Sequence, residues 1–367
     1  MAFEKFKSRA LKSKWTKLFV LSSVLQLIFI CALEGNVLRR NNNYRLQVQS
    51  AINNQTAGSG CNLDPSYDRM YNIQSENIVF MVFQVFQLFL CMNAVYNQNT
   101  IQIITIAATN FLCGLYGIVQ IFEISKWISD LQKNCPTNPT FTGQFRSQYG
   151  SNDIPLVVFL VIFASIIAFV SFKLYQEFGW NIYKRIGADI QMQKIYKTML
   201  IFVLLLKIDL FFVLLTGIEA IATLHHETEP RLPNDSISLT KGLFYFHVVV
   251  TIMFLFLEVL AYSSLRRENR PGMMLYITLS IITIVDFCII LKSSLKAIAQ
   301  AWYFFIVIVV IAVILSIDLV QVTWIYSILV FLNFDKGLRP LVDKQKGDSE
   351  IGGIIPDEGR KRINLDD

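Results

Sequence analysis

Apolar residues gather along this chain in continuous blocks of about twenty, the length of helix that crosses a hydrocarbon layer about 30 Å thick. An outer-membrane barrel would instead alternate apolar and polar residues with a period of two. The composition agrees, because 54% of the 367 residues are hydrophobic and only 16% are charged. The chain is therefore predicted to be an all-α, polytopic transmembrane helix bundle that has the lipid bilayer as a partner.

Eight spans are predicted, and they form a single transmembrane helical domain over residues 1–335. The second and third are separated only by "NQNT", which predicts a tight helical hairpin. The semi-polar "KSSLKAIAQ" between the last two leaves a count of seven spans as the alternative. The first span is expected to be an uncleaved signal anchor, because no small-x-small cleavage site follows it. The spans cover residues 16–36, 77–97, 101–123, 154–173, 199–220, 242–262, 273–292 and 302–331.

The distribution of Lys and Arg gives the orientation. With eight spans, the side that holds both termini carries about twice as many Lys and Arg as the other side, although its loops are shorter. Because positive residues favour the cytosolic side, the N- and C-termini are predicted to be cytosolic. Residues 336–367 contain too few apolar side chains to form a core, so they are predicted to be a disordered cytosolic tail.

Two sequons and two cysteines fall in loops assigned to the lumenal side. Asn54 and Asn234 each begin an Asn-x-Ser/Thr triplet, which predicts a glycoprotein of the secretory system. Cys61 and Cys135 lie in the first two lumenal loops, and we hypothesise a disulfide between them. Two free thiols are the alternative, and alkylation of the unreduced protein would distinguish the two. The other four cysteines lie within spans, as reduced, apolar side chains.

Charged residues inside the later spans form the candidate site. Such residues are costly in a bilayer and usually face other helices or water, where they find partners. Lys207 and Asp209 are two residues apart on a helix, about 200° around it, so they cannot pair with each other. Lys207 is predicted to pair with Asp318 or Glu258, whereas Asp209 and Asp286 are expected to lack a cationic partner. The site comprises Lys207, Asp209, Glu258, Asp286 and Asp318.

Two interpretations of these charges remain open. In one, they form a polar clamp that fixes the register of the helices. In the other, they line a proton or cation path, as acidic residues do in pumps and transporters. Transporters often contain internal repeats and helices broken by Gly or Pro near the midplane. The spans of this chain lack internal proline and show no convincing repeat, which favours the clamp.

The segment between the fourth and fifth spans predicts a corner. Phe178, Ile182, Ile186 and Ile190 recur every four residues, which indicates a short amphipathic helix at the membrane interface. Gly187 suits the position that follows a helix, and Asp189 suits the N-cap of the next helix. The polar and aromatic residues expected in the cytosolic headgroup layer are Trp180, Tyr183, Lys184 and Arg185.

The chain contains few of the patterns that carry enzymatic chemistry. It has no phosphate-binding Gly-rich loop, no Gly-x-Ser-x-Gly and no CxxC pair. His225 and His226 are adjacent in a predicted lumenal loop without the helical spacing of metal ligands, so a solvated loop is expected there. We therefore predict a protein that is not an enzyme, with no cofactor, no metal site and no nucleic-acid partner. Its protein partners are not indicated.

Four stretches of the sequence resemble an uncharacterised family of fungal Golgi apparatus multi-pass membrane proteins. They are "EFGWNIYKRIGAD", "LLLKIDLFF", "RRENRPGMM" and "NFDKGLRP", and the resemblance is strongest from about Tyr175 onward. In relatives, proline often follows the Gly-Ala-Asp, whereas this chain has Ile190 there. The resemblance implies a location in the Golgi membrane. It implies no reaction and no catalytic or ligand residue.

Three functions follow from these observations. The first is a non-enzymatic Golgi or endomembrane protein that acts in membrane organisation or trafficking. The second is a proton- or cation-coupled transporter that uses the acidic groups of spans five to eight. The third is a seven-helix receptor. The receptor is disfavoured because an even number of spans places the N-terminus in the cytosol.

Overall fold

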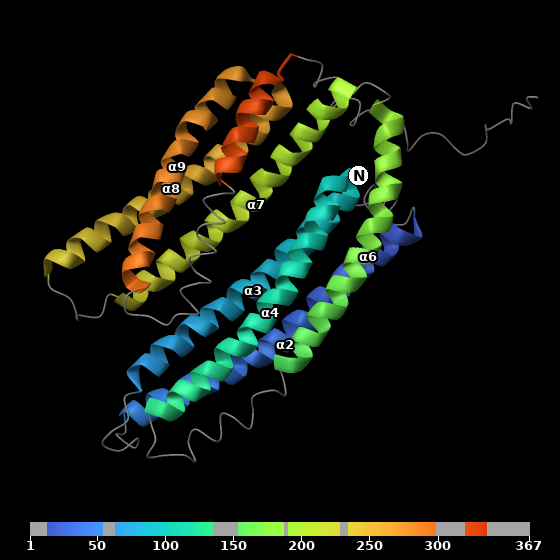
Figure 1. The fold of residues 1–367 in the computed structure, drawn as a ribbon. Helices are drawn as coiled ribbons and strands as arrows, with labels where there is room; N and C mark the ends of the chain where they lie inside the picture. Colours follow the sequence, from blue (N-terminus) through green and yellow to red (C-terminus); the bar gives the residue numbers. More distant parts are fainter. Residues whose placement is uncertain are drawn as a thin grey trace, which may run out of the picture. The chain divides into compact units, whose positions relative to one another are not determined.

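A computed structural model describes residues 13–53, 63–134, 153–186, 190–227, 234–298 and 320–335. Within these ranges the secondary structure is helical with short turns, and no strand occurs among them, as the all-α prediction requires. Five of the described helices are long and apolar enough to cross a membrane. The helices are α2 (Lys14–Asn53), α3 (Asp64–Asn97), α4 (Thr100–Asn134), α6 (Asp153–Ile186), α7 (Ile190–Glu227), α8 (Asn234–Arg267), α9 (Arg270–Ile298) and Val320–Leu332 (Figure 1).

The contacts between residues divide the chain into two compact units, Met1–Gly187 and Ala188–Asp367. The sequence indicated one helical domain over 1–335, and the division falls at the predicted corner. In the first unit, α2 contacts α3 and α6, and α4 contacts the same two helices, which closes a four-helix bundle. In the second unit, α8 contacts α7 and α9.

The helices of the first unit are much longer than the bilayer requires. The 40 residues of α2 correspond to about 60 Å of helix. Residues 37–53 and 64–76 were predicted as parts of a lumenal loop, and the structure shows them as the ends of α2 and α3. Buried apolar residues line these ends and the facing end of α4, and they form a core of their own. This core includes Tyr44, Val48, Met70, Ile73, Ile124, Trp127 and Leu131.

The segment predicted as a separate interfacial helix is instead the end of α6. Helix α6 runs without a break from Asp153 to Ile186, and Phe178 is buried against Phe19 and Leu174 in the core of the bundle. Phe178 therefore contributes to packing between helices, because its position continues the buried face of the fourth span. α7 begins at Ile190, on the far side of the expected corner.

Two short turns join consecutive helices. Helix α3 ends at Asn97 and α4 begins at Thr100, so "NQNT" does form a tight hairpin. Gln98 takes a left-handed conformation with φ of 51°, and the Asn99 side chain accepts hydrogen bonds from the backbone N–H groups of Ile101 and Gln102. Asn99 thereby satisfies N–H groups that the first turn of α4 would otherwise leave without partners. Between α8 and α9, Glu268 has the same φ of 51°.

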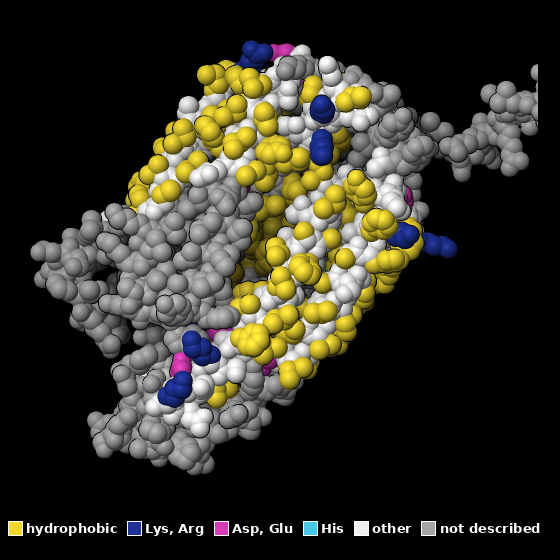
Figure 2. Space-filling view, viewed as in Figure 1, with side chains coloured by type: hydrophobic (Ala, Val, Ile, Leu, Met, Phe, Trp, Pro, Cys, Tyr) yellow, Lys and Arg dark blue, Asp and Glu magenta, His cyan; other side chains and the backbone are white. Residues whose placement is uncertain are grey.

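The outer faces of the described helices are apolar. Figure 2 shows hydrophobic side chains spread over these faces, with the visible Lys and Arg gathered near helix ends. More than half of the surface of some large side chains is exposed, such as Phe122 on α4 and Phe256 on α8. In water such a surface would favour aggregation, whereas in a bilayer the lipid tails cover it. This distribution agrees with a multi-pass membrane protein.

Candidate functional site

The second unit buries most of the predicted charged site. Asp209 of α7 is 1% exposed, Glu258 of α8 is 6% exposed and Asp286 of α9 is 5% exposed. Lys207 is only partly buried on α7. Asp318 lies outside the described residues. Three carboxyl groups from three successive helices are thus turned away from the lipid.

Asp209 and Glu258 form one pair of neighbouring carboxyl groups. They interact electrostatically with each other and with the buried Tyr276 of α9. The Thr323 hydroxyl of the last described helix lies beside Asp209. Among the described residues, neither oxygen of Asp209 has a partner with good hydrogen-bond geometry, and the same is true of Glu258 Oε1. Buried carboxyl oxygens without well-formed hydrogen bonds are costly, and this makes the pair the strongest functional candidate in the second unit.

The predicted pairing of Lys207 is not supported in one of its two forms. Among the described residues of this unit, the ion pairs join His247 to Asp286 and Arg270 to Asp335, and none joins Lys207 to Glu258. Glu258 faces Asp209 instead. Pairing of Lys207 with Asp318 stays a prediction, since Asp318 lies outside the described part of the chain.

Asp286 has a partner that the sequence analysis did not assign. His247 Nδ1 lies 2.5 Å from Asp286 Oδ1, although Asp286 was expected to lack a cationic partner. The sequence analysis did not name His247 as a partner of Asp286. The register of the hairpin offered a signal: with a turn at Glu268 and Asn269, antiparallel α8 and α9 place residue 247 opposite a position near 290. His247 and Asp286 are therefore neighbours by topology.

A stripe of polar residues on α9 runs from the Asp209–Glu258 pair to the His247–Asp286 pair. Tyr276, Ser280, Thr283 and Asp286 are spaced by four, three and three residues, so they lie on one face, and all four are buried. On α8, Glu258 and His247 are eleven residues apart, which is close to three full turns and places them on one face too. We call these six residues the polar seam: His247, Glu258, Tyr276, Ser280, Thr283 and Asp286.

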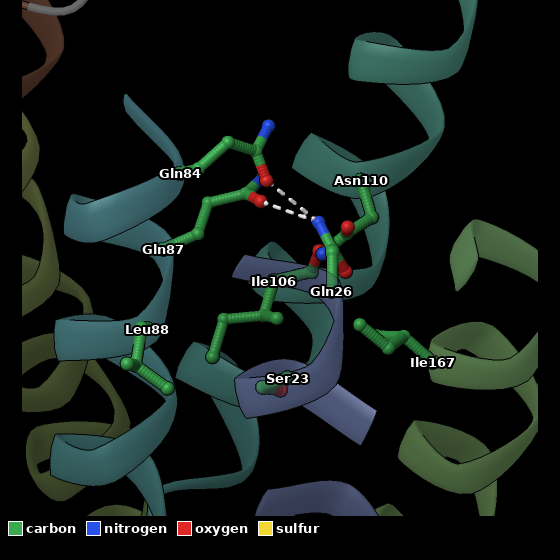
Figure 3. A pocket seen from close by; sticks show the side chains of 8 residues that line it. All are labelled: Ser23, Gln26, Gln84, Gln87, Leu88, Ile106, Asn110 and Ile167. Atoms are coloured by element: carbon green, nitrogen blue, oxygen red, sulfur yellow. Dashed lines mark hydrogen bonds between the residues drawn. The ribbon is translucent and has the colours of Figure 1, made fainter. Parts of the chain in front are cut away.

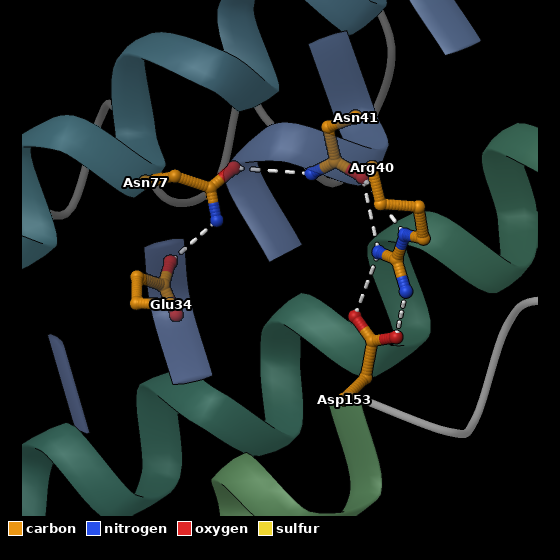
Figure 4. A network of polar contacts seen from close by, with 5 residues as sticks. All are labelled: Glu34, Arg40, Asn41, Asn77 and Asp153. Atoms are coloured by element: carbon orange, nitrogen blue, oxygen red, sulfur yellow. Dashed lines mark hydrogen bonds and ion pairs between the residues drawn. The ribbon is translucent and has the colours of Figure 1, made fainter. Parts of the chain in front are cut away.

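The first unit contains a different polar group, which sequence reasoning missed. Arg40 of α2 forms a bidentate ion pair with Asp153 at the start of α6, and its Nη2 atom donates to Asp153 Oδ1 over 3.0 Å (Figure 4). Arg40 also donates to Asn41 Oδ1, and Asn41 donates to Asn77 Oδ1 over 3.1 Å. Asn77 in turn donates to Glu34. These five residues are called the polar network.

The polar network joins three of the four helices of its unit. Glu34, Arg40 and Asn41 come from α2, Asn77 from α3 and Asp153 from α6 (Figure 4). The side chain of Gln120 on α4 lies beside Glu34. The sequence analysis did not include Glu34 in the candidate site, and its span of residues 16–36 placed Arg40 in a loop. Polar side chains of different helices are therefore joined in the first unit, as expected of a polar clamp.

A second buried ion pair lies in the same part of the bundle. Arg69 of α3 pairs with Glu123 of α4. Nearby, the Tyr44 and Trp127 rings stack with centroids 6.2 Å apart, and Trp127 Nε1 donates to the Ser66 carbonyl over 2.9 Å. The polar ends of α2, α3 and α4 are thus held by both ionic and aromatic contacts.

Amide side chains meet in the middle of the first unit (Figure 3). Gln26 Nε2 donates to Gln84 Oε1 over 2.9 Å and to Gln87 Oε1 over 3.2 Å. The amide nitrogens of Gln84 and Gln87 face Cys113 Sγ at 3.9 and 3.6 Å. These contacts join α2, α3 and α4 without any charged side chain.

Several predicted residues are not tested by the structure. Asn54, Cys61, Cys135, Gly187 and Asp189 lie outside the described residues. Asn234 is the first residue of α8, and the backbone of α6 includes Trp180, Tyr183, Lys184 and Arg185 in its last two turns. The four described cysteines are free, as expected for thiols within spans: Cys31, Cys91, Cys113 and Cys288.

Comparison with known proteins gives one relevant similarity. A UPF0658 Golgi apparatus membrane protein of Schizosaccharomyces pombe is 28% identical to this chain over 212 residues. The match covers 52% of this chain and 55% of the relative, so the chain spans about half the length of the curated relative it matches. No family model matches the chain, and no solved structure matches it. The resemblance to uncharacterised fungal Golgi membrane proteins is thereby confirmed, and it agrees with a multi-pass protein of the Golgi membrane.

Proposed function

We propose that this Golgi multi-pass membrane protein transfers protons through its second unit, without enzymatic chemistry. The observation that carries the proposal is the buried carboxyl pair of Asp209 and Glu258, with three oxygens that lack well-formed hydrogen bonds among the described residues. Two adjacent carboxyl groups in a low-dielectric interior favour sharing a proton over carrying two charges. Such a pair can accept and release a proton with little rearrangement of its surroundings.

The polar seam supplies the rest of the path. Tyr276, Ser280 and Thr283 carry hydroxyl groups, which both donate and accept hydrogen bonds. They lie on one face of α9 and lead toward the pair of His247 and Asp286, about 15 Å along the helix from Tyr276. Chains of Asp, Glu, His and hydroxyl groups at bilayer depth are typical of proton relays. The path thus begins and ends at groups that can carry a proton.

Transport is favoured over the clamp for these acidic residues because the described cations do not neutralise the carboxyl pair. A structural clamp would pair charges of opposite sign, as Arg40 and Asp153 do in the first unit. In the second unit, Glu258 faces another carboxyl group. This arrangement is costly for stability, and a functional role accounts for the cost.

Membrane organisation or trafficking is the second candidate, and the first unit favours it. Its helices continue beyond the predicted spans and keep a packed core there. A helical surface held outside the bilayer is suited to docking partners or cargo. This function and proton transfer use different units, so both can hold in one protein.

Proton flux into proteoliposomes tests the proposal. We expect the full-length protein to acidify vesicles that contain a pH-sensitive dye when a pH gradient and a compensating K⁺ pathway are imposed. Asp209→Asn and Glu258→Gln should each lower the initial rate at least about ten-fold, because an amide cannot carry the proton. Asp286→Asn should lower the rate as well, since it removes the far end of the seam.

Asp335→Asn is the matched control, because its carboxyl group is exposed at a helix end and pairs with Arg270. Its flux should equal that of the wild type. Repeating the assay with a Na⁺ or K⁺ gradient in place of the pH gradient distinguishes cation coupling from proton transfer. No flux under any gradient, or equal flux in all variants, would contradict the proposal and leave organisation as the better candidate.

A further inference from the structure

A small polar cavity lies between the four helices of the first unit. Its walls come from α2, α3, α4 and α6, and Figure 3 shows the amide groups of Gln26, Gln84 and Gln87 converging on one side of it. The cavity has a free volume of about 10 Å³. A cavity that holds one water molecule encloses about one water-sized sphere, roughly 10–15 Å³. The lining residues are Ser23, Gln26, Gln84, Gln87, Leu88, Ile106, Asn110 and Ile167.

Two polar atoms at this cavity lack a good partner among the described residues. Gln26 is 3% exposed, and its Oε1 accepts no hydrogen bond, although its Nε2 donates two. Ser23 is 7% exposed, and its hydroxyl group reaches only the Cys91 thiol, which is a weak acceptor. Leaving a buried polar atom unsatisfied is costly, because the atom loses its hydrogen bonds to water without replacement.

The cavity lies where lipid cannot satisfy Gln26 Oε1 or the Ser23 hydroxyl, so only a molecule inside the cavity can do so. Residues 26, 87, 110 and 167 lie close to the centres of the four predicted spans, so the cavity lies near the middle of the bilayer. Lipid tails offer no hydrogen bond to Gln26 or Ser23 at that depth. The partner must therefore be inside the bundle.

We propose that the cavity binds one water molecule, which donates to Gln26 Oε1 and hydrogen-bonds the Ser23 hydroxyl. Water fits the available space, and it needs the two to four polar partners that this cavity provides. A cation does not suit the site, because every lining side chain is neutral and a charge at this depth needs a counter-charge. The occupant is therefore a single neutral molecule that can donate hydrogen bonds.

The water would complete a link between helices. Gln26 of α2 already donates to two glutamines of α3, and those glutamines face Cys113 of α4. With the carbonyl group of Gln26 also satisfied, the amide cluster has no missing hydrogen bond at its centre. This site is independent of the proton path in the second unit.

Water-edited solid-state NMR tests the proposal. The full-length protein is labelled with ¹⁵N in the glutamine side chains and reconstituted in lipid bilayers. Polarisation should pass from water to the Gln26 amide as rapidly as to a hydrated surface glutamine. In Ser23→Val, whose added methyl groups occupy about the volume of one water, the transfer to Gln26 should be lost while the rest of the spectrum is kept.

Ser165→Val provides the matched control. Ser165 lies at a similar depth on α6 but is exposed to lipid, where its hydroxyl group bonds the Val161 carbonyl. This variant should keep the transfer to Gln26. The proposal is overturned if the wild type shows no transfer, which would mean an empty cavity, or if Ser23→Val leaves the transfer unchanged. If Ser23→Val does not fold, density at the Gln26 carbonyl in a high-resolution experimental structure of the wild type decides.

Discussion

At the scale of single residues, the first unit depends on a few buried polar side chains whose partners come from other helices. Arg40 and Asp153 are 113 positions apart in the sequence and both nearly excluded from solvent. Charges in such surroundings are tolerated when each has a partner and its other atoms are hydrogen-bonded. Arg40 meets this condition because Asn41 Oδ1 also accepts hydrogen bonds from its Nε and Nη2 atoms.

Removing one partner of this pair should therefore be more damaging than removing both. We expect Arg40→Met to lower the free energy of unfolding by about 3–5 kcal/mol, because it leaves Asp153 buried and unpaired. The double variant Arg40→Met/Asp153→Leu should be more stable than Arg40→Met alone, since apolar residues of similar size need no partner. Denaturant unfolding in detergent micelles, followed by circular dichroism, gives these values.

An exposed ion pair in the same unit serves as the control. Lys133 and Asp130 lie 3.8 Å apart, and the lysine side chain is 76% exposed. Lys133→Met should change the free energy of unfolding by less than about 1 kcal/mol. Equal losses from Arg40→Met and Lys133→Met would show that the buried pair has no special role.

At the scale of helices, close packing between α4 and α6 depends on a glycine. A Cβ atom at Gly117 would lie 2.8 Å from Leu160 Cδ1 and 3.3 Å from Val157 Cγ2 on α6. Small residues let the backbones of membrane helices approach each other, where dispersion contacts supply much of the attraction. Gly35 on α2 has no atom within 4 Å of the same position, so it has no such packing role.

The same substitution at the two glycines should separate packing from helix propensity. Gly117→Val should lower the free energy of unfolding by about 1–3 kcal/mol more than Gly35→Val does, because it forces Leu160 and Val157 to move. Both variants place an identical side chain inside a helix, so the difference reports the contact alone. Thermal unfolding of the two purified variants measures it, and equal effects would argue against tight α4–α6 packing.

Most helices can be predicted from the sequence, but some helix ends cannot. Length and hydropathy suffice to predict membrane helices, and the four residues between spans two and three suffice to predict their hairpin. The ends of α2 and α3 were missed because Asn, Gln and Arg lower the mean hydropathy there. Tyr44, Val48 and Ala51 nevertheless keep the spacing of a helix that buries one face. A search for helical periodicity would have detected this signal.

The candidate sites were less predictable, for a different reason. Burial of Asp209, Glu258 and Asp286 could be expected, because charged residues within a span turn away from lipid. Their partners depend on which helices are neighbours and in what register. His247 could have been assigned to Asp286 from the hairpin, whereas Arg40 with Asp153 and Gln26 with Gln84 required the arrangement of the whole bundle.

At the scale of the whole molecule, the number of spans decides which side of the membrane each terminus occupies. Five described helices qualify as candidate spans by length and hydropathy. The predicted total of eight gives an even number of crossings, and the distribution of Lys and Arg then predicts that both termini lie in the cytosol. A seven-helix receptor would have its termini on opposite sides.

Protease protection in sealed Golgi vesicles distinguishes these arrangements. Short epitope tags fused to the N-terminus and to the C-terminus should both be removed by protease added outside. A third tag inserted between α4 and α6, in a predicted lumenal loop, should be removed only after detergent opens the vesicles. Protection of one terminal tag alone would instead support seven spans.

The excess length of α2 gives the first unit a mechanical property. Residues 37–53 continue the helix for about 25 Å past the predicted membrane segment, and α4 supports it there through the stacked rings of Tyr44 and Trp127. A stiff rod of this kind converts rotation at its base into translation at its tip. A change of about 10° in the tilt of the bundle would move the end of α2 by roughly 4 Å. A change in bilayer thickness that alters the tilt therefore displaces the end of α2 outside the membrane.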